Sequence, residues 1–443
     1  MNYMNYSDKT EVLNLDEIKF KKKDKKKIFF RIIPIIMIPF LVVLTIISIH
    51  SKKLIIVPIN YIIYILLSLF IYLLLIGFFL VKKNKTNKSK KQKIISVVTK
   101  VVATIYILGC SSFLFLLYGP YGNFRTWLIS TAMSTMNHQY LCKWFYNDKE
   151  IDKVINSNYI VEVNEETDTD LIDMKTEKYD NEYEEKILKR NKDDKYKIIE
   201  LEVNGQKAYL AAIYDPALVK VAVTKNLGRQ GQYVTKMAED NNALLAVNGG
   251  GFYDPGNNST GGMPTGVTIS NGKIITDNNY SSYTQSGGLI GMTNDNKLVL
   301  IKGATARKAL NMGVRDGVSW GPFLIINGKK SFIKGNGGWG YAARTAMGQR
   351  SDGIILLLVV NSNSSRTKGA DMVDLTNIMY NYGAINAANL DGGTSTVMVL
   401  PNKESLKYIS SCDKAYCYIN DPIDSLLRHR TRGIATSIIV ADK

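Results

Sequence analysis

The sequence predicts an α+β protein, with a mixed-sheet domain over residues 200–443 behind three N-terminal transmembrane helices. Two observations predict this organisation. Three apolar runs in the first 118 residues are each long enough to cross a hydrocarbon core of about 30 Å. From residue 197 onward, short strand-like runs alternate with turn signals such as Asn204-Gly205, and helical patterns are few.

The apolar runs span residues 28–49, 54–81 and 94–118. Buried helices of a soluble core are the alternative interpretation, but these lengths fit membrane spans better. The first run does not fit a cleavable signal peptide, because it is long and the next run follows after four residues. We therefore predict a three-span membrane anchor over residues 28–118.

Lysines predict the orientation of this anchor. Residues 1–27 form a basic tail, and the loop of residues 82–93 contains seven lysines. The positive-inside rule places both in the cytoplasm, so with three spans everything after residue 118 lies outside. Residues 1–100 hold nineteen Lys and Arg against five Asp and Glu, which is +14 of the net +17. The basic charge is therefore not a nucleic-acid-binding footprint on the C-terminal domain.

Residues 119–199 divide into an aromatic and an acidic part. Residues 119–147 repeat aromatic and apolar side chains at helical spacing, which fits either a helix at the membrane interface or one packed on the C-terminal domain. Residues 148–200 contain seventeen acidic side chains and few aliphatic ones. Such composition seldom buries enough apolar surface to fold, so we predict a partly disordered acidic spacer.

The C-terminal domain has its elements in a regular order. Residues 354–360 are almost wholly apolar, as in a central strand buried on both faces. Asp371 is placed to cap a helix that ends near Tyr382. The other expected elements are a helix over 232–241 and strands over 198–203, 208–214, 219–223, 244–247, 267–270, 273–276, 289–292, 297–301, 323–326, 331–333, 382–388, 397–400 and 435–441.

Three glycine-rich turns follow expected strands. They are Asn248-Gly-Gly-Gly-Phe252, the stretch over residues 337–348 that contains Arg344, and Asn389-Leu-Asp-Gly-Gly-Thr-Ser395. Taken alone, the last is consistent with an ordinary hairpin, since Asp-Gly is a strong turn signal. Three such turns, each with a polar side chain, point instead to one shared site on a rigid scaffold.

The residue types limit the chemistry of that site. The chain has only three histidines and no Cys-x-x-Cys, so any metal would need oxygen ligands. No Walker loop or dinucleotide-binding fingerprint is present. Arg344 has the planar fork that binds phosphate, although a structural arginine is the alternative. Asn248 is either a ligand-binding amide or a turn residue. Cys412 and Cys417 are close enough in sequence to form a disulfide.

Four motifs, in order, resemble the phosphodiester glycosidase family. They are Asn248-Gly-Gly-Gly-Phe252, Gly266-Val-Thr-Ile-Ser-Asn-Gly272, Arg344-Thr-Ala-Met-Gly348 and Asp391-Gly-Gly-Thr-Ser395. Here Gly251 is an extra glycine, and Thr394 stands where the family usually has glycine. The resemblance implies that Asp391, Arg344 and Asn248 are catalytic. It also implies substrate binding by Gly249, Gly250, Phe252, Thr345, Gly392, Gly393, Thr394 and Ser395.

The resemblance implies an extracytoplasmic, membrane-anchored hydrolase. It would remove an N-acetylglucosamine-like sugar from a sugar-1-phosphodiester in exopolysaccharide or cell-wall glycan, with no required cofactor but with an oxygen-ligated divalent ion as an option. The alternative is a non-catalytic protein of the cell envelope that binds anionic glycan. A transporter component fits less well, because the spans lack an acidic residue or paired charges. The expected partners are the glycan and the membrane, without nucleic acid.

Overall fold

The computed structural model describes residues 39–51, 90–120, 122–134, 139–174, 181–253, 261–278, 287–362, 369–422 and 431–442. The described chain forms two compact units. One comprises residues up to 128 together with 140–151, and the other comprises 129–139 together with 152 onward.

The first unit contains one long apolar helix. Helix α3 (Lys90–Tyr118) includes Val101–Tyr118, the one stretch among the described residues that is long and apolar enough to cross a membrane. A shorter apolar helix covers Pro39–Ser51. The predicted span over residues 54–81 and the first part of the span over 28–49 lie outside the described residues. Three spans therefore stay a prediction.

Short helices follow α3 along the chain. They are α4 (Gly122–Met133), α5 (Gln139–Phe145) and α6 (Asp148–Asn156). The last turn of α4 belongs to the second unit, where the Asn336 side-chain amide donates to Ser130 Oγ at 2.7 Å. This part of the aromatic segment therefore packs on the C-terminal domain, which was one of the two interpretations left open by the sequence.

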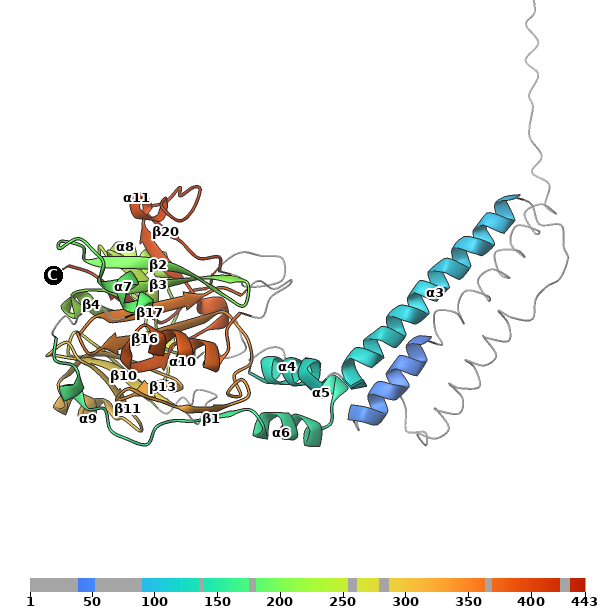
Figure 1. Ribbon diagram of the computed structural model, residues 1–443, viewed down its shortest axis with the longest axis horizontal. Helices are drawn as coiled ribbons and strands as arrows, with labels where there is room; N and C mark the ends of the chain where they lie inside the picture. Colours follow the sequence, from blue (N-terminus) through green and yellow to red (C-terminus); the bar gives the residue numbers. More distant parts are fainter. Residues whose placement is uncertain are drawn as a thin grey trace, which may run out of the picture. The chain divides into compact units, whose positions relative to one another are not determined.

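The second unit is built on a seven-stranded sheet (Figure 1). Its spatial order is β14-β13-β18-β16-β17-β3-β2. The bounds in chain order are β2 (Tyr196–Val203), β3 (Gln206–Ile213), β13 (Phe323–Ile326), β14 (Lys329–Lys330), β16 (Arg344–Arg350), β17 (Ile355–Val360) and β18 (Ala384–Asn389). All pairs in this sheet are antiparallel, so the prediction of a mixed sheet was wrong while the α+β class is confirmed.

Two five-stranded antiparallel sheets lie against it. One has the order β11-β10-β12-β8-β9 and the other β20-β19-β5-β21-β4. The bounds are β4 (Val219–Val223), β5 (Leu245–Asn248), β8 (Val267–Ser270), β9 (Lys273–Asp277), β10 (Gly288–Thr293), β11 (Leu298–Ile301), β12 (Val314–Trp320), β19 (Met398–Pro401), β20 (Tyr416–Tyr418) and β21 (Thr436–Val440). Two ribbons pair β1 (Tyr159–Val161) with β15 (Phe332–Lys334), and β6 (Phe252–Tyr253) with β7 (Met263–Pro264).

The main core lies between the sheets. Leu357 and Met347 of the seven-stranded sheet pack there with Val247 of one smaller sheet and Ile290 of the other. The opposite face of the large sheet is covered by α10 (Met372–Asn381) and α7 (Glu182–Leu188). Helices α8 (Val234–Asp240) and α9 (Ala306–Asn311) each pack on the outer face of one smaller sheet. The described chain also contains the short helix α11 (Asn402–Ser405).

The strongest sequence signals are confirmed. Strand β17 is buried along its whole length, and Asp371 caps α10 through a capping box with Asp374. The stretch from Arg344 to Gly348 differs, because it is a central strand and not a turn. Its side chains are mixed, with Met347 in the core and Arg344 and Thr345 polar, and all are buried between β17 and β18, so no apolar run marks the strand in the sequence.

The acidic segment is not a free spacer. Strand β1 pairs with β15, the Glu162 carboxylate accepts from the Phe323 amide at 2.8 Å, and Ile172 and Ile187 are fully buried. Some of its few apolar residues, such as Ile172 and Ile187, pack on the domain that later strands form. Prediction from composition failed here, because it considers only the surface that a segment can bury against itself.

Candidate active site

The Asn248 side chain joins three of the predicted motifs. It lies at the end of β5 and is fully buried. Its amide nitrogen donates to the Asp391 carbonyl at 2.6 Å, and its oxygen accepts from Thr345 Oγ1 at 2.7 Å and from the Val397 amide at 3.2 Å. These contacts indicate that the buried side chains of Asn248 and Thr345 hold the Asp391 turn in position. They fit a positioning role better than the direct substrate contact predicted for both residues.

Asp391 follows β18, where the chain turns into a short helical turn over Gly393–Ser395. Its side chain is 12% exposed. Oδ1 accepts from the Gly392 amide at 2.9 Å, and Oδ2 lies 3.5 Å from Nη2 of Arg432. Burial raises the pKa of the Asp391 carboxyl, against the opposing effects of Arg432, Ser395, Gly392 and Arg344. The carboxyl is therefore both shielded and accessible at one edge.

Arg432 provides the cation that pairs with Asp391, and it was not among the site residues predicted from the sequence. Its Nε and Nη2 donate to Ser395 Oγ at 3.0 and 2.8 Å, and its guanidinium lies 4.7 Å from the centroid of the Phe252 ring. The side chain is 20% exposed, so one side of the planar group faces solvent. Arg432 was missed because it lies outside the four motifs. Its place just before the closing strand, which pairs with β5, is the signal that could have revealed it.

Arg344 is held differently. It is 5% exposed and donates Nε to the Ala370 carbonyl at 3.2 Å and Nη2 to the Gly340 carbonyl at 2.8 Å. Burial lowers its pKa to about 10, against the opposing charges of Asp371 and Asp391. Along β16 successive side chains point to opposite faces of the sheet, so Arg344 and Thr345 do not share a face. These bonds are those of a structural arginine, but Nη1 lies 3.6 Å from the Cβ position of Gly392 and its charge opposes the burial that raises the pKa of Asp391, so the predicted catalytic role of Arg344 stays a prediction.

The glycines of the first turn are needed for close packing. A Cβ atom on Gly249 would lie 2.5 Å from Thr436 Oγ1, and one on Gly250 would lie 2.6 Å from the Ser319 carbonyl oxygen. On Gly251, the extra glycine, it would lie 2.0 Å from a ring carbon of Trp320. Gly251 therefore makes room for Trp320 beside the site.

The second glycine turn is more open. A Cβ atom on Gly392 would lie 2.9 Å from the Ala343 carbonyl oxygen, whereas Gly393 has φ +61° and nothing near its Cβ position. Thr394 is half-buried and Ser395 is buried. The structure thus gathers Phe252, Ser395 and the two glycines around Asp391 and Arg432. It offers an anionic ligand one guanidinium, the backbone of a glycine turn and one carboxylate.

Within the described residues, no group of three or more His, Cys, Asp or Glu side chains is arranged to hold a metal ion. The oxygen-ligated divalent ion stays an untested option, and the chemistry below uses only groups of the chain.

The fold and the site define an antiparallel α+β domain with a half-shielded carboxylate–guanidinium pair at a glycine turn. Residues 241–441 match the family model described as phosphodiester glycosidase, and this part of the chain is a domain of that family. The resemblance predicted from the four motifs is confirmed.

Individual relatives are distant. The SPbeta prophage-derived uncharacterized protein YomE of Bacillus subtilis (strain 168) is 25% identical over 218 residues, which are 46% of this chain and 33% of YomE. The chain thus matches about a third of the length of that curated relative.

Among solved structures, the zebrafish N-acetylglucosamine-1-phosphodiester alpha-N-acetylglucosaminidase catalytic domain, auto-inhibited by its pro-peptide, has a TM-score of 0.42 and 20% identity, covering 58% of this chain and 87% of that one. A hypothetical protein from Synechocystis has a TM-score of 0.35 and 17% identity, covering 55% and 61%.

Proposed function

We propose that the chain is a membrane-anchored, extracytoplasmic hydrolase that removes an N-acetylglucosamine-like sugar from a sugar-1-phosphodiester in exopolysaccharide or cell-wall glycan. The observation that supports this most is the Asp391–Arg432 pair at 3.5 Å, at the edge of a domain of the phosphodiester glycosidase family. The pair offers a carboxylate for the sugar and a cation for the phosphate, close enough for one sugar phosphodiester to contact both.

The reaction would break the bond between the anomeric carbon and the phosphate oxygen. A phosphomonoester leaves with the bonding electrons, and the oxygen of a water molecule ends on the anomeric carbon. Because phosphate is a good leaving group, the main need is to stabilise its charge and the oxocarbenium-like carbon. Arg432 and the amides of the glycine turn would serve the phosphate. Asp391 would face the carbon, either as nucleophile or as the base that takes the proton of water.

The ion pair supports this role for Asp391. Burial alone favours the neutral acid, whereas the reaction needs the carboxylate. Arg432, Ser395 and the Gly392 amide each favour the ionised form. When the guanidinium turns toward a phosphate, Asp391 loses part of this stabilisation, which makes it more basic as the substrate binds.

Turnover by the full chain in detergent or nanodiscs is the decisive test. A chromogenic N-acetylglucosamine phosphodiester is the substrate, and Asp391→Asn is expected to lower kcat by at least about a thousandfold, while Asp295→Asn at an exposed position leaves it unchanged. Equal turnover by wild type and Asp391→Asn would refute the assignment. Binding of the substrate without any turnover by wild type would favour the non-catalytic glycan-binding alternative.

The extracytoplasmic location is part of the proposal. It is supported by the lysine-rich loop before α3, which predicts the same orientation for α3 whether the anchor has one span or three. The disulfide between Cys412 and Cys417 fits an oxidising compartment. Protease added to intact cells should digest a tag placed after residue 443, and a protected tag would contradict the orientation.

A further inference from the structure

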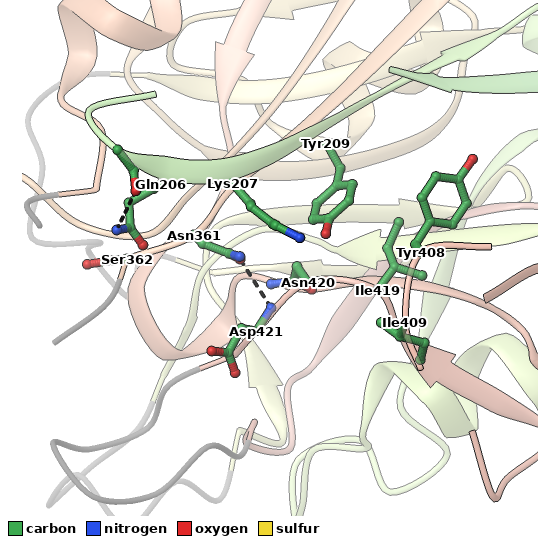
Figure 2. Close-up of a pocket in the computed structure, with 11 residues that line it drawn as sticks. Gln206, Lys207, Tyr209, Asn361, Ser362, Tyr408, Ile409, Ile419, Asn420 and Asp421 are labelled. Atoms are coloured by element: carbon green, nitrogen blue, oxygen red, sulfur yellow. Dashed lines mark hydrogen bonds between the residues drawn. The ribbon is translucent and has the colours of Figure 1, made fainter. Parts of the chain in front are cut away.

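A pocket of about 500 Å³ opens at the edge of the seven-stranded sheet, away from the Asp391 turn (Figure 2). It lies beside the start of β3 and the end of β17. Its walls combine aromatic, amide and charged side chains: Lys207, Tyr209, Asn361, Tyr408, Ile409 and Asp421 contribute most of the chemistry. None of these residues has a role in the reaction proposed above.

Two donors in this pocket have no partner among the residues that the structure describes. Tyr209 is only 2% exposed, yet Figure 2 shows its hydroxyl directed into the pocket, and the hydroxyl makes no hydrogen bond among the described residues. Lys207 lies two residues earlier on β3 and hence on the same face of the strand. Its exposed side chain lines the same pocket and forms no ion pair within the described part of the chain. Lys207 is exposed and the Tyr209 hydroxyl lines the pocket, so both donors are accessible to a ligand.

The donors indicate the charge of a ligand that would fit this pocket. Burial raises the pKa of Tyr209, with Glu200, Asp421 and Tyr408 adding to the effect, so the hydroxyl stays protonated at neutral pH. An ammonium and a protonated hydroxyl on one face of β3, two residues apart, match an anionic oxygen, as in a phosphate or carboxylate.

The other walls match a sugar. The Tyr408 ring, packed edge-on to Tyr209 at 6.2 Å, and Ile409 offer apolar surface for the face of a pyranose. The Asp421 amide donates to Asn361 Oδ1 at 3.2 Å and so orients the Asn361 side chain at the rim. Amide and carboxylate groups at this rim suit the hydroxyls of a sugar ring.

The pocket and the Asp391 turn lie some distance apart at the same end of neighbouring strands of the sheet. In the register, Arg344 is opposite Val360 and Val360 is opposite Ala208. Asp391 follows β18, which pairs with the other side of β16, so three strand spacings of about 4.8 Å, about 14 Å in all, separate the Asp391 turn from the pocket. The pocket residue Asn420 also donates to the carbonyl of Thr396, the residue after Ser395, at 3.0 Å. One oligosaccharide is long enough to reach both places.

We propose that this pocket is a second saccharide-binding site, which holds a sugar unit bearing a phosphate or carboxylate while another part of the same polymer lies at Asp391. The link between the two places rests on the proposed function. Binding at the pocket itself does not.

Binding is tested by titration calorimetry on the full chain in nanodiscs. The probes are N-acetylglucosamine 6-phosphate, glucuronate and neutral N-acetylglucosamine. Wild type should bind at least one anionic sugar about tenfold more tightly than the neutral one, and the stronger anion identifies the group recognised. Lys207→Gln and Tyr209→Phe should each weaken that binding about tenfold, the loss expected for a hydrogen bond to a charged group. Lys273→Gln, an exposed lysine on β9, is the matched control and should change nothing.

The Asp391→Asn variant distinguishes probe binding at the pocket from probe binding at the active site. It should leave binding of the anionic probe within about twofold of wild type. If Asp391→Asn abolishes binding and Lys207→Gln does not, the probe binds at the active site and the pocket proposal is overturned. Equal binding of neutral and anionic sugars, or no binding, would overturn it too.

Kinetics distinguish this inference from the proposed reaction. On a single-sugar chromogenic phosphodiester, Lys207→Gln should match wild type. On an oligosaccharide phosphodiester with an anionic unit, it should raise KM about tenfold at unchanged kcat. If the wild type binds the anionic probe at Lys207 but cleaves neither substrate, the proposed hydrolysis is refuted and saccharide binding at the pocket is supported. An unchanged KM for the oligosaccharide would refute the shared-substrate link.

Discussion

Replacing Asn248 by alanine tests whether this side chain holds the site together. The substitution removes three hydrogen bonds, to the Asp391 carbonyl, to Thr345 Oγ1 and to the Val397 amide. Each buried hydrogen bond contributes about 1 kcal/mol net, so Asn248→Ala should lower the free energy of unfolding by about 3 kcal/mol. For a domain of this size that corresponds to about 6–12 °C in Tm.

Thermal unfolding of the full chain in one detergent, with the same samples assayed for turnover, measures both consequences. A positioning residue predicts a loss in kcat together with the loss in Tm, whereas a residue that only binds substrate predicts a raised KM at unchanged Tm. Asn377→Ala, at an exposed position of α10, is the control and should shift the free energy of unfolding by less than about 0.5 kcal/mol. A Tm for Asn248→Ala within 2 °C of wild type would refute the reasoning.

The other predictions concern three positions around the same turn. Burial raises the pKa of Asp391 in the folded chain, so its contribution to stability is complete below the ordinary aspartate pKa and is lost as pH rises through the raised value. Asp391→Asn should therefore raise Tm at pH 7.5 and lose that advantage toward pH 3. An equal gain at both pH values would contradict the burial argument. Arg432→Lys keeps the charge but loses the planar fork, and KM for the phosphodiester should rise about tenfold. An unchanged KM would remove Arg432 from the phosphate site. Gly251→Ala places a methyl group against Trp320, and overpacking of this kind should lower the free energy of unfolding by about 1–3 kcal/mol, as urea unfolding would measure. Gly122→Ala, which has nothing within 4 Å of its Cβ position, serves as its comparison and should not destabilise.

Local chemistry predicted much of the fold. Asn204, Asn271 and Asn327 all have positive φ before a glycine, and each closes a hairpin that the sequence predicts. The apolar run of β17 predicts a central strand, because only such a strand is buried on both faces. These signals depend on neighbours in the sequence, which is why they can be recognised without the structure.

The parts that could not be predicted depend on distant partners. Strand β16 has no apolar periodicity. It can be buried because its polar side chains form hydrogen bonds with loops, such as that from Arg344 to the Gly340 carbonyl. The grouping of Asn248 with Asp391 was predicted from the family order of motifs, and the structure brings the two together. Arg432 reaches the same turn from the far end of the domain, and its place just before the closing strand becomes informative only once that strand is known to pair with β5.

The site can form only after β21, the last strand to be synthesised, has left the ribosome. This strand lies between β5 and β4, and the stretch just before it supplies Arg432. Both flanking strands emerge from the ribosome first and must wait for this last partner, for about 10 to 40 s at the usual 5–20 residues per second. Until then β5 has an open edge and Asp391 has no counterion from Arg432. A chain interrupted before residue 431 would thus lack both β21 and Arg432, so partly made or clipped molecules should have no activity.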